Sequence, residues 1–334
     1  MIVAKIKELL EVPRKVVITT HYKPDGDAIG SSLGLYNYLL KKGHAVTFIA
    51  PSDYPDFLQW MAGNEHVIEI QKDPVGSATA IEAAEIIFCL DFNRISRCES
   101  VAPHIAAAKG FKVNIDHHLE PESFCDLELT DPTASSTAEL IYRFIVAMGD
   151  RALLDQDIAE CIYTGIMTDT ASFRFVSATA ETYEVAADLI RAGARNYIAH
   201  EAIYDVWSED RIRLVGYCTQ EKMMVLNEFN TAIIGLSNAE LNRFHHKTGD
   251  TEGIVNIPLS IKNIRLSVLF VERKGEVKIS FRSKDDFSVR DFSDKYFEGG
   301  GHKNASGGRS SLSLEDTIKR FISLLPEYKA ELTR

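Results

Sequence analysis

The sequence lacks several features that would place it in common protein classes. Its five cysteines are scattered, odd in number and without a Cys-x-x-Cys pair, which indicates reduced thiols and not a disulfide framework. No apolar run approaches the roughly 18 residues of a membrane span. The N-terminal stretch MIVAKIKELLEVPRK is typical of an amphipathic helix and not of a signal peptide. We therefore expect a soluble, cytoplasmic protein that does not bind membranes.

Positive charge is also in short supply. The chain has 37 Lys and Arg residues against 48 Asp and Glu residues, a formal net charge of −11. Long nucleic acids are held by clustered cations that displace counterions, so an acidic chain is a poor candidate for binding a long duplex. A short or small anionic substrate held by a few directed groups fits the composition better. We find neither an internal repeat nor a low-complexity tract.

The length and the hydrophobic content predict two domains. With 334 residues and 45% hydrophobic content, the chain can form a sizeable core in each of them. From about residue 16 to 118, β-like runs alternate with helix-like stretches, which is the pattern of a doubly wound, mainly parallel α/β sheet. The expected helices of this half are Ala28–Lys42, Tyr54–Met61, Val101–Lys109, Ser135–Met148, Asp155–Thr168 and Ala180–Ala192.

The second half of the chain has a different pattern of expected helices and strands. Residues 195–222 are charged and strongly helical, and we predict that they form a connector between a catalytic domain, 1–194, and a smaller mixed α/β domain, 223–334. The second domain contains strand-like runs such as IRLSVLFVER and EVKISFRS, a glycine-rich turn, and a closing helix over Leu314–Lys329.

Acidic and imidazole side chains recur where buried apolar runs end. The residues are His21, Asp25 and Asp27 in one block, Asp91 in a second, Asp116, His117 and His118 in a third, and Asp169 in a fourth. A single such residue is more often a helix cap or a satisfied polar group. Carboxylates at the ends of hydrophobic strands are costly to bury together without a cation, so the combined pattern predicts a metal site.

The spacing places these side chains at one edge of the predicted sheet. The His-x-x-x-Asp-x-Asp pattern follows the β-branched run Val16–Thr20 and precedes a helix, and ligands of open α/β sheets bind outside the carboxyl ends of the strands. Carboxylate oxygens with imidazole nitrogens suit Mn²⁺, Mg²⁺, Fe²⁺ or Zn²⁺. We expect a dinuclear metal centre that acts on phosphate.

A second group of polar residues lies in the C-terminal half. The segment GGGHKNASGG combines glycines, which let the backbone approach an anion, with His302, Lys303 and Asn304. Arg282, on an alternating strand, offers a forked donor for phosphate or carboxylate. A plain glycine-rich turn and a solvated arginine are the alternative interpretations.

The metal blocks resemble the DHH phosphoesterase superfamily, named after the triplet Asp116-His117-His118, and the tail resembles its DHH-associated C-terminal domain. DGDAIGSSLGL, DPTASSTAEL, GIMTDTASFRF and GGGHKNASGG are most similar to the branch of short oligoribonucleases, or nanoRNases, that are also phosphoadenosine-phosphate phosphatases. Two departures are Ala171, where a Gly is common, and LEPESF, which lacks an expected Asn.

The resemblance implies a cofactor and a role for each site residue. It implies two Mn²⁺ ions, with Asp91 shared between both. One ion is held by His21, Asp25 and Asp91, and the other by Asp27, Asp91, His117 and Asp169. Asp116 orients the triplet, while His118 supports the ligands or contacts the scissile phosphate. Arg282 and His302 clamp substrate phosphate, and Gly300, Gly301 and Asn304 line the pocket.

Three functions follow from the resemblance. The first is hydrolysis of very short RNA to nucleoside monophosphates, with removal of the 3′-phosphate of phosphoadenosine phosphate. The second is a phosphodiesterase specific for linear dinucleotides from cyclic dinucleotide signalling. The third is a nucleotide sensor without turnover, against which the complete set of ligand positions argues. Whether the chain forms a homodimer is left open.

Overall fold

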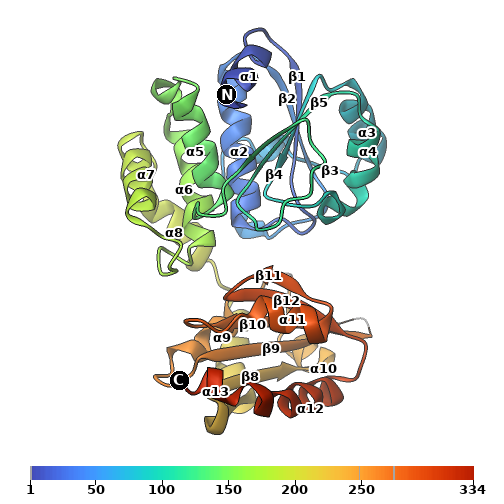
Figure 1. The fold of residues 1–334 in the computed structure, drawn as a ribbon, viewed down its shortest axis with the longest axis vertical. Helices are drawn as coiled ribbons and strands as arrows, with labels where there is room; N and C mark the ends of the chain where they lie inside the picture. The colour runs from blue at the N-terminus through green and yellow to red at the C-terminus, as the bar shows by residue number, and fades with distance from the viewer. Residues whose placement is uncertain (1, 248, 274) are drawn as a thin grey trace. The chain divides into compact units, whose positions relative to one another are not determined.

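The structure is a computed structural model that describes residues 2–247, 249–273 and 275–334. The chain divides into two compact units, Met1–Val206 and Trp207–Arg334. None of the helices in these described ranges combines the length and apolar character needed to cross a membrane. Each unit is built around its own six-stranded sheet (Figure 1).

The first unit contains a parallel sheet with strand order β3-β2-β1-β4-β5-β6. The chain order reverses between β1 and β4, which makes these two central strands the topological switch point of a doubly wound fold. The strands are β1 (Lys15–Thr19), β2 (Ala45–Ala50), β3 (Ile68–Glu69), β4 (Ile86–Leu90), β5 (Phe111–Asp116) and β6 (Leu127–Thr130).

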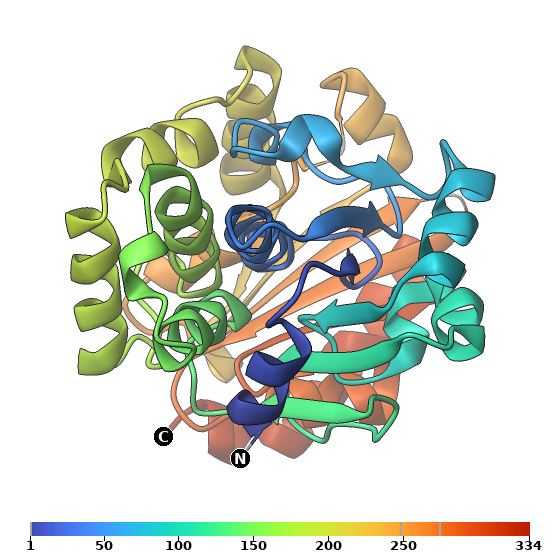
Figure 2. The ribbon, with the colours of Figure 1, turned by 90° about the horizontal axis from the view of Figure 1, so that it is seen from above.

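Helices cover both faces of this sheet (Figures 1 and 2). On one face, α2 (Gly26–Lys41), α5 (Thr137–Ala147) and α6 (Gln156–Asp169) pack on inward side chains such as Ile18 and Phe88. On the other face, α3 (Pro74–Ala83) and α4 (Ala102–Ala107) cover the alternate strand residues, among them Ile87. Strand side chains alternate between faces, so both sets are buried and the strands are apolar throughout. The unit also contains α1 (Ile2–Leu9), α7 (Ala180–Arg191) and α8 (Asn196–Tyr204).

Two glycines allow α2 and α6 to approach closely. A Cβ atom on Gly30 would lie 2.6 Å from the backbone oxygen of Cys161 and 2.8 Å from the backbone nitrogen of Gly165. A Cβ atom on Gly165 would lie 2.5 Å from Cβ of Ala138 on α5 and 3.0 Å from Oδ1 of Asp27 on α2. The pair therefore fixes the start of α2, which carries Asp27, relative to α6, which ends at Asp169.

The second unit contains a mixed sheet with strand order β11-β12-β10-β9-β8-β7, in which only β8 and β9 are parallel. One face packs on α11 (Val289–Phe297) and α12 (Leu314–Leu324), and the other on α9 (Glu209–Tyr217), α10 (Asn238–Arg243) and the 3-10 segment Ile254–Ser260. The strands are β7 (Met223–Leu226), β8 (Thr231–Leu236), β9 (Leu266–Arg273), β10 (Glu276–Ser283), β11 (Gly300–His302) and β12 (Ala305–Ser310). The chain closes with the short helix α13 (Lys329–Leu332).

The expected fold class is confirmed, and several individual elements are corrected. The helix expected over Tyr54–Met61 is only a 3-10 turn, Asp56–Leu58, which starts after Pro55. The closing helix ends at Leu324 and is followed by the 3-10 turn Leu325–Tyr328, because Pro326 has no N–H to continue the α-helical hydrogen bonds. The glycine-rich turn is in fact an antiparallel strand pair, β11 with β12.

Candidate metal centre

The predicted ligands of the first unit lie where its three adjacent central strands end. His21 follows β1, Asp91 follows β4, and Asp116 is the last residue of β5, with His117 and His118 directly after it. Since β1, β4 and β5 are neighbours and parallel, their carboxyl ends form one edge of the sheet. This edge includes the switch point, where open α/β sheets bind ligands.

His21, Asp25 and Asp91 form the first ligand cluster, their donor atoms all within 4.8 Å of one another. Nε2 of His21 lies 3.4 Å from Oδ2 of Asp91 and 3.8 Å from Oδ1 of Asp25. Donors that share one ion at about 2.0–2.2 Å lie about 3–3.5 Å apart at common coordination angles. Nδ1 of His21 faces the backbone oxygen of Tyr22 at 2.9 Å, so in the neutral ring Nδ1 carries the proton and the lone pair of Nε2 is directed at the cluster.

Asp27, His117 and Asp169 form the second ligand cluster. Nε2 of His117 lies 3.5 Å from Oδ2 of Asp169 and 3.8 Å from Oδ2 of Asp27. Nδ1 of His117 lies 3.3 Å from the backbone oxygen of Ala134, which again directs Nε2 toward the carboxylates. Asp169 is the last residue of α6, where the helix dipole disfavours a negative charge unless a cation is nearby.

Asp91 lies within reach of both clusters. Besides its 3.4 Å separation from His21, its Oδ1 lies 3.8 Å from Nε2 of His117. Its backbone is left-handed, with φ of 66°, a conformation that Asp tolerates better than most residues. The side chain is almost fully buried, 2% exposed for the residue, so it has little solvent to offset its charge.

The start of α5 holds the two buried carboxylates in place. The backbone N–H of Thr137 donates to Oδ2 of Asp27 at 2.7 Å, and that of Ala138 donates to Oδ1 at 2.8 Å. The Thr137 hydroxyl donates to Oδ1 of Asp91 at 2.9 Å. Unpaired N–H groups at a helix start favour anions, so α5 positions both candidate ligands. This role of Thr137 is not predicted from the sequence, where DPTASST indicates only a cap-rich turn.

The pKa values of the clustered groups reflect the repulsion between their carboxylates. Burial, together with the charges of Asp91 and Asp169, raises the pKa of Asp27 well above its usual value. Burial opposes protonation of His21, yet its contacts with Asp25 and Asp91 raise the pKa of His21 to about 10. Without a metal, protons must therefore balance the clustered carboxylates. The donor types, their spacing and this charge balance fit divalent metal ions.

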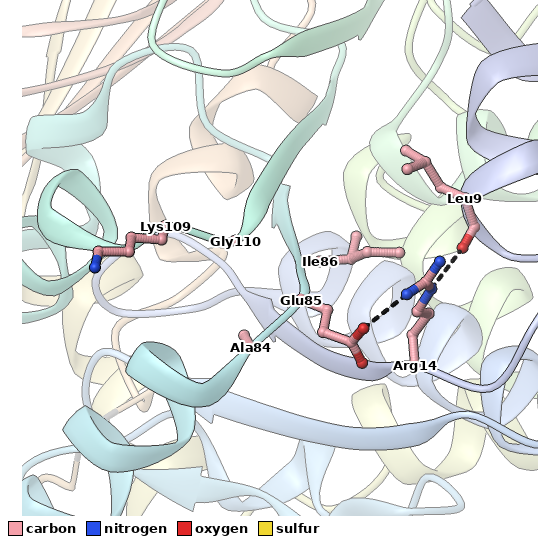
Figure 3. Close-up of a pocket in the computed structure, with 7 residues that line it drawn as sticks. All are labelled: Leu9, Arg14, Ala84, Glu85, Ile86, Lys109 and Gly110. Carbon is pink, nitrogen blue, oxygen red and sulfur yellow. Dashed lines mark hydrogen bonds and ion pairs between the residues drawn. The ribbon is translucent and has the colours of Figure 1, made fainter.

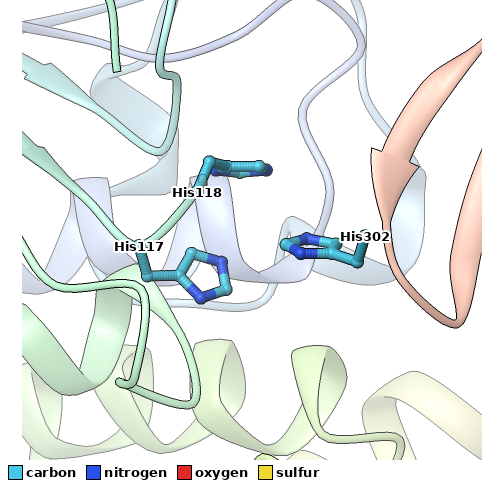
Figure 4. Close-up of side chains that lie close together, drawn as sticks. All are labelled: His117, His118 and His302. Carbon is cyan, nitrogen blue, oxygen red and sulfur yellow. The ribbon is translucent and has the colours of Figure 1, made fainter. Parts of the chain in front are cut away.

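The remaining members of the triplet are joined to each other. Nδ1 of His118 lies 2.7 Å from Oδ1 of Asp116, and the same nitrogen lies 3.7 Å from Oδ1 of Asp91. Oδ2 of Asp116 is buried without a hydrogen-bond partner among the described residues. Figure 4 shows His117 and His118 side by side after β5. The centroids of their rings are 5.0 Å apart. Asp116 thus fixes the ring of His118 beside the ligands.

The predicted substrate residues of the second unit lie in one row of its sheet. Ala305 on β12 pairs with Arg282 on β10 and with His302 on β11. His302 is labelled in Figure 4. Directly opposed residues of antiparallel strands share a face, so Arg282 and His302 flank Ala305 on the same side. Gly300 and Gly301 are exposed on β11.

Asn304 has a local structural role. Its amide nitrogen donates to Oγ of Ser283 at 2.9 Å and to the backbone oxygen of Asp285 at 3.1 Å. These bonds tie the link between β11 and β12 to the end of β10, which keeps the strand pair in register beside Arg282.

A surface pocket at the opposite edge of the first sheet differs in character. It has a volume of about 350 Å³ and lies at the amino ends of β1, β4 and β5 (Figure 3). Its main polar feature is an ion pair in which Nη1 of Arg14 lies 2.8 Å from Oε1 of Glu85. Apolar Leu9 and Ile86 line the rest, together with Ala84, Lys109 and Gly110. None of the described residues that line this pocket belongs to a candidate metal-ligand cluster.

Comparison with known proteins assigns the chain to a family. Residues 15–166 match the DHH family N-terminal domain, and residues 229–331 match the DHHA1 domain. The bifunctional oligoribonuclease and PAP phosphatase NrnA of Thermus thermophilus is 31% identical over 335 residues, covering 100% of this chain and 94% of that protein. The cyclic-di-AMP phosphodiesterase GdpP of Geobacillus thermodenitrificans is 24% identical, covering 97% of this chain but 49% of that protein.

Solved structures agree with this assignment. An exopolyphosphatase-related protein from Bacteroides fragilis is 40% identical, with a TM-score of 0.96, and covers 99% of this chain and 97% of its own. RecJ from Thermus thermophilus, solved with Mn²⁺, shares the fold at 13% identity, with a TM-score of 0.55 over 98% of this chain and 55% of its own. The chain belongs to the DHH family of phosphoesterases and carries a DHHA1 domain.

Proposed function

We propose that this protein hydrolyses very short RNA to nucleoside monophosphates and also removes the 3′-phosphate of phosphoadenosine phosphate. The observation that carries the proposal is the pair of ligand clusters on either side of Asp91. The full-length similarity to a bifunctional oligoribonuclease and PAP phosphatase supports the choice of substrate.

The proposed cofactor is a pair of divalent ions, Mn²⁺ by preference. His21, Asp25 and Asp91 would hold one ion, and Asp27, His117 and Asp169 would hold the other. Asp91, whose Oδ1 lies 3.8 Å from Nε2 of His117, would be shared by both. When bound, such ions stabilise the charge that develops during in-line displacement at phosphorus and lower the pKa of the attacking water.

The protein's own groups set the geometry of this reaction. Thr137 orients Asp91, and the start of α5 fixes both oxygens of Asp27, so neither carboxylate has to reorganise during turnover. Asp116 occupies Nδ1 of His118, which leaves Nε2 as the atom with which His118 contacts the scissile phosphate.

The second unit is proposed to bind the rest of the substrate. Arg282 and His302 share one face of its sheet and flank Ala305, whose small side chain leaves room between a guanidinium and an imidazole. A planar guanidinium forms paired hydrogen bonds with phosphate oxygens. Gly300 and Gly301 allow a phosphate or ribose to approach the backbone of β11.

A second candidate is a phosphodiesterase specific for linear dinucleotides. This candidate is supported by the similarity to a cyclic-di-AMP phosphodiesterase over 97% of this chain. A nucleotide sensor without turnover is disfavoured, because a binding protein does not require all six ligand positions.

One experiment ranks these candidates. The protein is incubated with Mn²⁺ and equal concentrations of di- to decaribonucleotides, linear and cyclic dinucleotides, and phosphoadenosine phosphate, and products are resolved by chromatography. We expect nucleoside monophosphates from several short RNAs and AMP from phosphoadenosine phosphate, with no activity in chelator. Turnover of linear dinucleotides alone would favour the second candidate, and binding without products the sensor.

A further inference from the structure

A strained turn directly follows the metal-ligand helix α6. Ala171, Ser172 and Phe173 are consecutive residues with φ values of 48°, 61° and 61°. Residues with a Cβ rarely adopt this left-handed conformation, and three in succession are unusual outside glycine-rich segments. The turn begins two residues after Asp169, so its conformation determines how α6 ends.

Hydrogen bonds from two backbone N–H groups hold part of this turn. The N–H of Ser172 donates to the backbone oxygen of Met167 at 2.7 Å, and the N–H of Phe173 donates to Oγ1 of Thr170 at 3.0 Å. Both bonds lead back into the last turn of α6. Any helix end can form bonds of this kind, so they do not explain why a strained form is retained.

The side chain of Ser172 has a partner on a different helix. Its Oγ lies 2.9 Å from Nε2 of His200, which belongs to α8. Nδ1 of His200 lies 2.8 Å from the backbone oxygen of Asn196. A carbonyl oxygen only accepts, so Nδ1 carries a proton, and in the neutral ring Nε2 accepts from the Ser172 hydroxyl.

Aromatic packing fixes the ring of His200. Its centroid lies 6.3 Å from that of Tyr163 on α6 and 5.9 Å from that of Tyr204 on α8. Tyr163 in turn packs on Phe173, with centroids 5.8 Å apart. The hydrogen bond and the ring contacts thus connect α8 to the strained turn from two sides.

We propose that His200 is a positioning residue: its bond to Ser172 holds the left-handed turn 171–173 closed, and the turn holds the Asp169 carboxylate in metal-binding geometry. This inference rests on the proposed function, in which Asp169 is a ligand. Asp169 is the last residue of α6 and its side chain is 26% exposed, so its position depends on how the helix ends at this turn.

The experiment compares two pairs of variants, with Mn²⁺ affinity measured by calorimetry on the full chain. Ser172→Ala keeps the strain and removes the bond, while Ser172→Gly removes the bond and lowers the strain, because glycine adopts positive φ freely. His200→Asn retains a donor near Asn196 but cannot reach Ser172, whereas His200→Gln can still accept from it.

We expect Ser172→Ala and His200→Asn to weaken Mn²⁺ binding about 10-fold, the lower end of the effect of residues that orient metal ligands. Ser172→Gly and His200→Gln should recover most of this loss. Saturating Mn²⁺ should restore kcat and leave KM unchanged. Substitution of a residue that touches substrate would instead alter KM even at saturating Mn²⁺. Circular dichroism confirms folding, and the Ser172 pair alone decides the matter if a His200 variant does not fold.

Asp169→Asn serves as the reference variant. If it loses Mn²⁺ affinity while Ser172→Ala and His200→Asn do not, the positioning role is wrong and the metal centre stands. Equal losses of Mn²⁺ affinity in Ser172→Ala and Ser172→Gly would also overturn the proposal. They would mean that the role of the Ser172 hydroxyl does not depend on strain in the turn. Wild-type affinity in Asp169→Asn would instead contradict the proposed function.

Discussion

At the scale of single residues, Asp91 is the side chain on which both ligand clusters depend. Replacing it with Asn keeps its shape but removes the charge that two cations would share, so we expect Asp91→Asn to lose at least about 100-fold in activity, more than the loss of an outer partner costs. Metal content of the folded variant should fall, as measured by plasma mass spectrometry.

The matched control for this variant is Asp157→Asn, an exposed carboxylate in the first turn of α6. It should keep full metal content and activity. Two retained ions with near wild-type turnover in Asp91→Asn would contradict the bridging role.

Proton release provides a second test at this scale. Asp25 and Asp91 raise the pKa of His21 to about 10 despite burial, so metal-free His21 holds an additional proton at pH 7. Burial also raises the pKa of Asp27. Metals bind the deprotonated ligands, so binding should release protons and weaken as pH falls from about 10. Calorimetry in buffers of different ionisation enthalpy measures the number released. No buffer dependence at pH 7 would contradict this charge balance.

Arg282 and His302 separate substrate capture from metal binding. Loss of a charge-assisted contact costs about 1.5–3 kcal/mol, so Arg282→Ala and His302→Ala should each lower kcat/KM about 10- to 100-fold and leave metal content unchanged. Arg309→Ala is the matched control, since this exposed arginine on β12 forms a surface ion pair with Glu298. Loss of bound metal in the Arg282 or His302 variants would refute this division of roles.

At the scale of elements, the contact between α2 and α6 sets the distance between ligands. Gly30→Ala would place a Cβ 2.6 Å from the backbone oxygen of Cys161, and backbone cannot move aside cheaply. Such overpacking typically costs about 1–3 kcal/mol, so we expect the calorimetric unfolding temperature to fall by several degrees.

Gly216→Ala in α9 is the control for this change. Nothing lies within 4 Å of the Cβ position there, so the substitution should be neutral or stabilising by about 0.5–1 kcal/mol. Equal effects of the two changes would mean that the helices do not need their close approach.

The elements also show what sequence reasoning can and cannot reach. Strand ends such as β1 before His21 and β4 before Asp91 were predictable, because a buried parallel strand is apolar throughout and stops at its first charged residues. The helix expected at Tyr54–Met61 was wrong, since only a 3-10 turn follows Pro55. The strand pair β11–β12 was not predicted, because strand formation depends on pairing with distant residues more than on the β-propensity of the segment itself.

The sequence predicted which residues gather at the site, but not the hydrogen bonds that connect them. Residue types and spacing predicted the candidate ligands that the structure groups together, whereas the donation from Thr137 to Asp91 joins residues 46 positions apart and leaves no local pattern. Ala171 stands where a Gly is common, and its φ of 48° gives the physical reason for that preference. The assignment of individual ligands and the domain boundaries stay predictions.

At the scale of the whole molecule, we expect a limit on substrate length. A second unit of this size can fix one terminal phosphate and stack one or two bases, each worth about 1–3 kcal/mol. The chain carries a net charge of −11, so additional phosphates gain no general attraction from it.

The measurement that tests the central claim most directly is kcat/KM against RNA length at fixed salt and saturating Mn²⁺. We expect the highest values for strands of about two to five nucleotides, and lower values for longer ones, because extra nucleotides add repulsion without contacts. Values that keep rising beyond about ten nucleotides would contradict this expectation and indicate a nuclease that grips long strands.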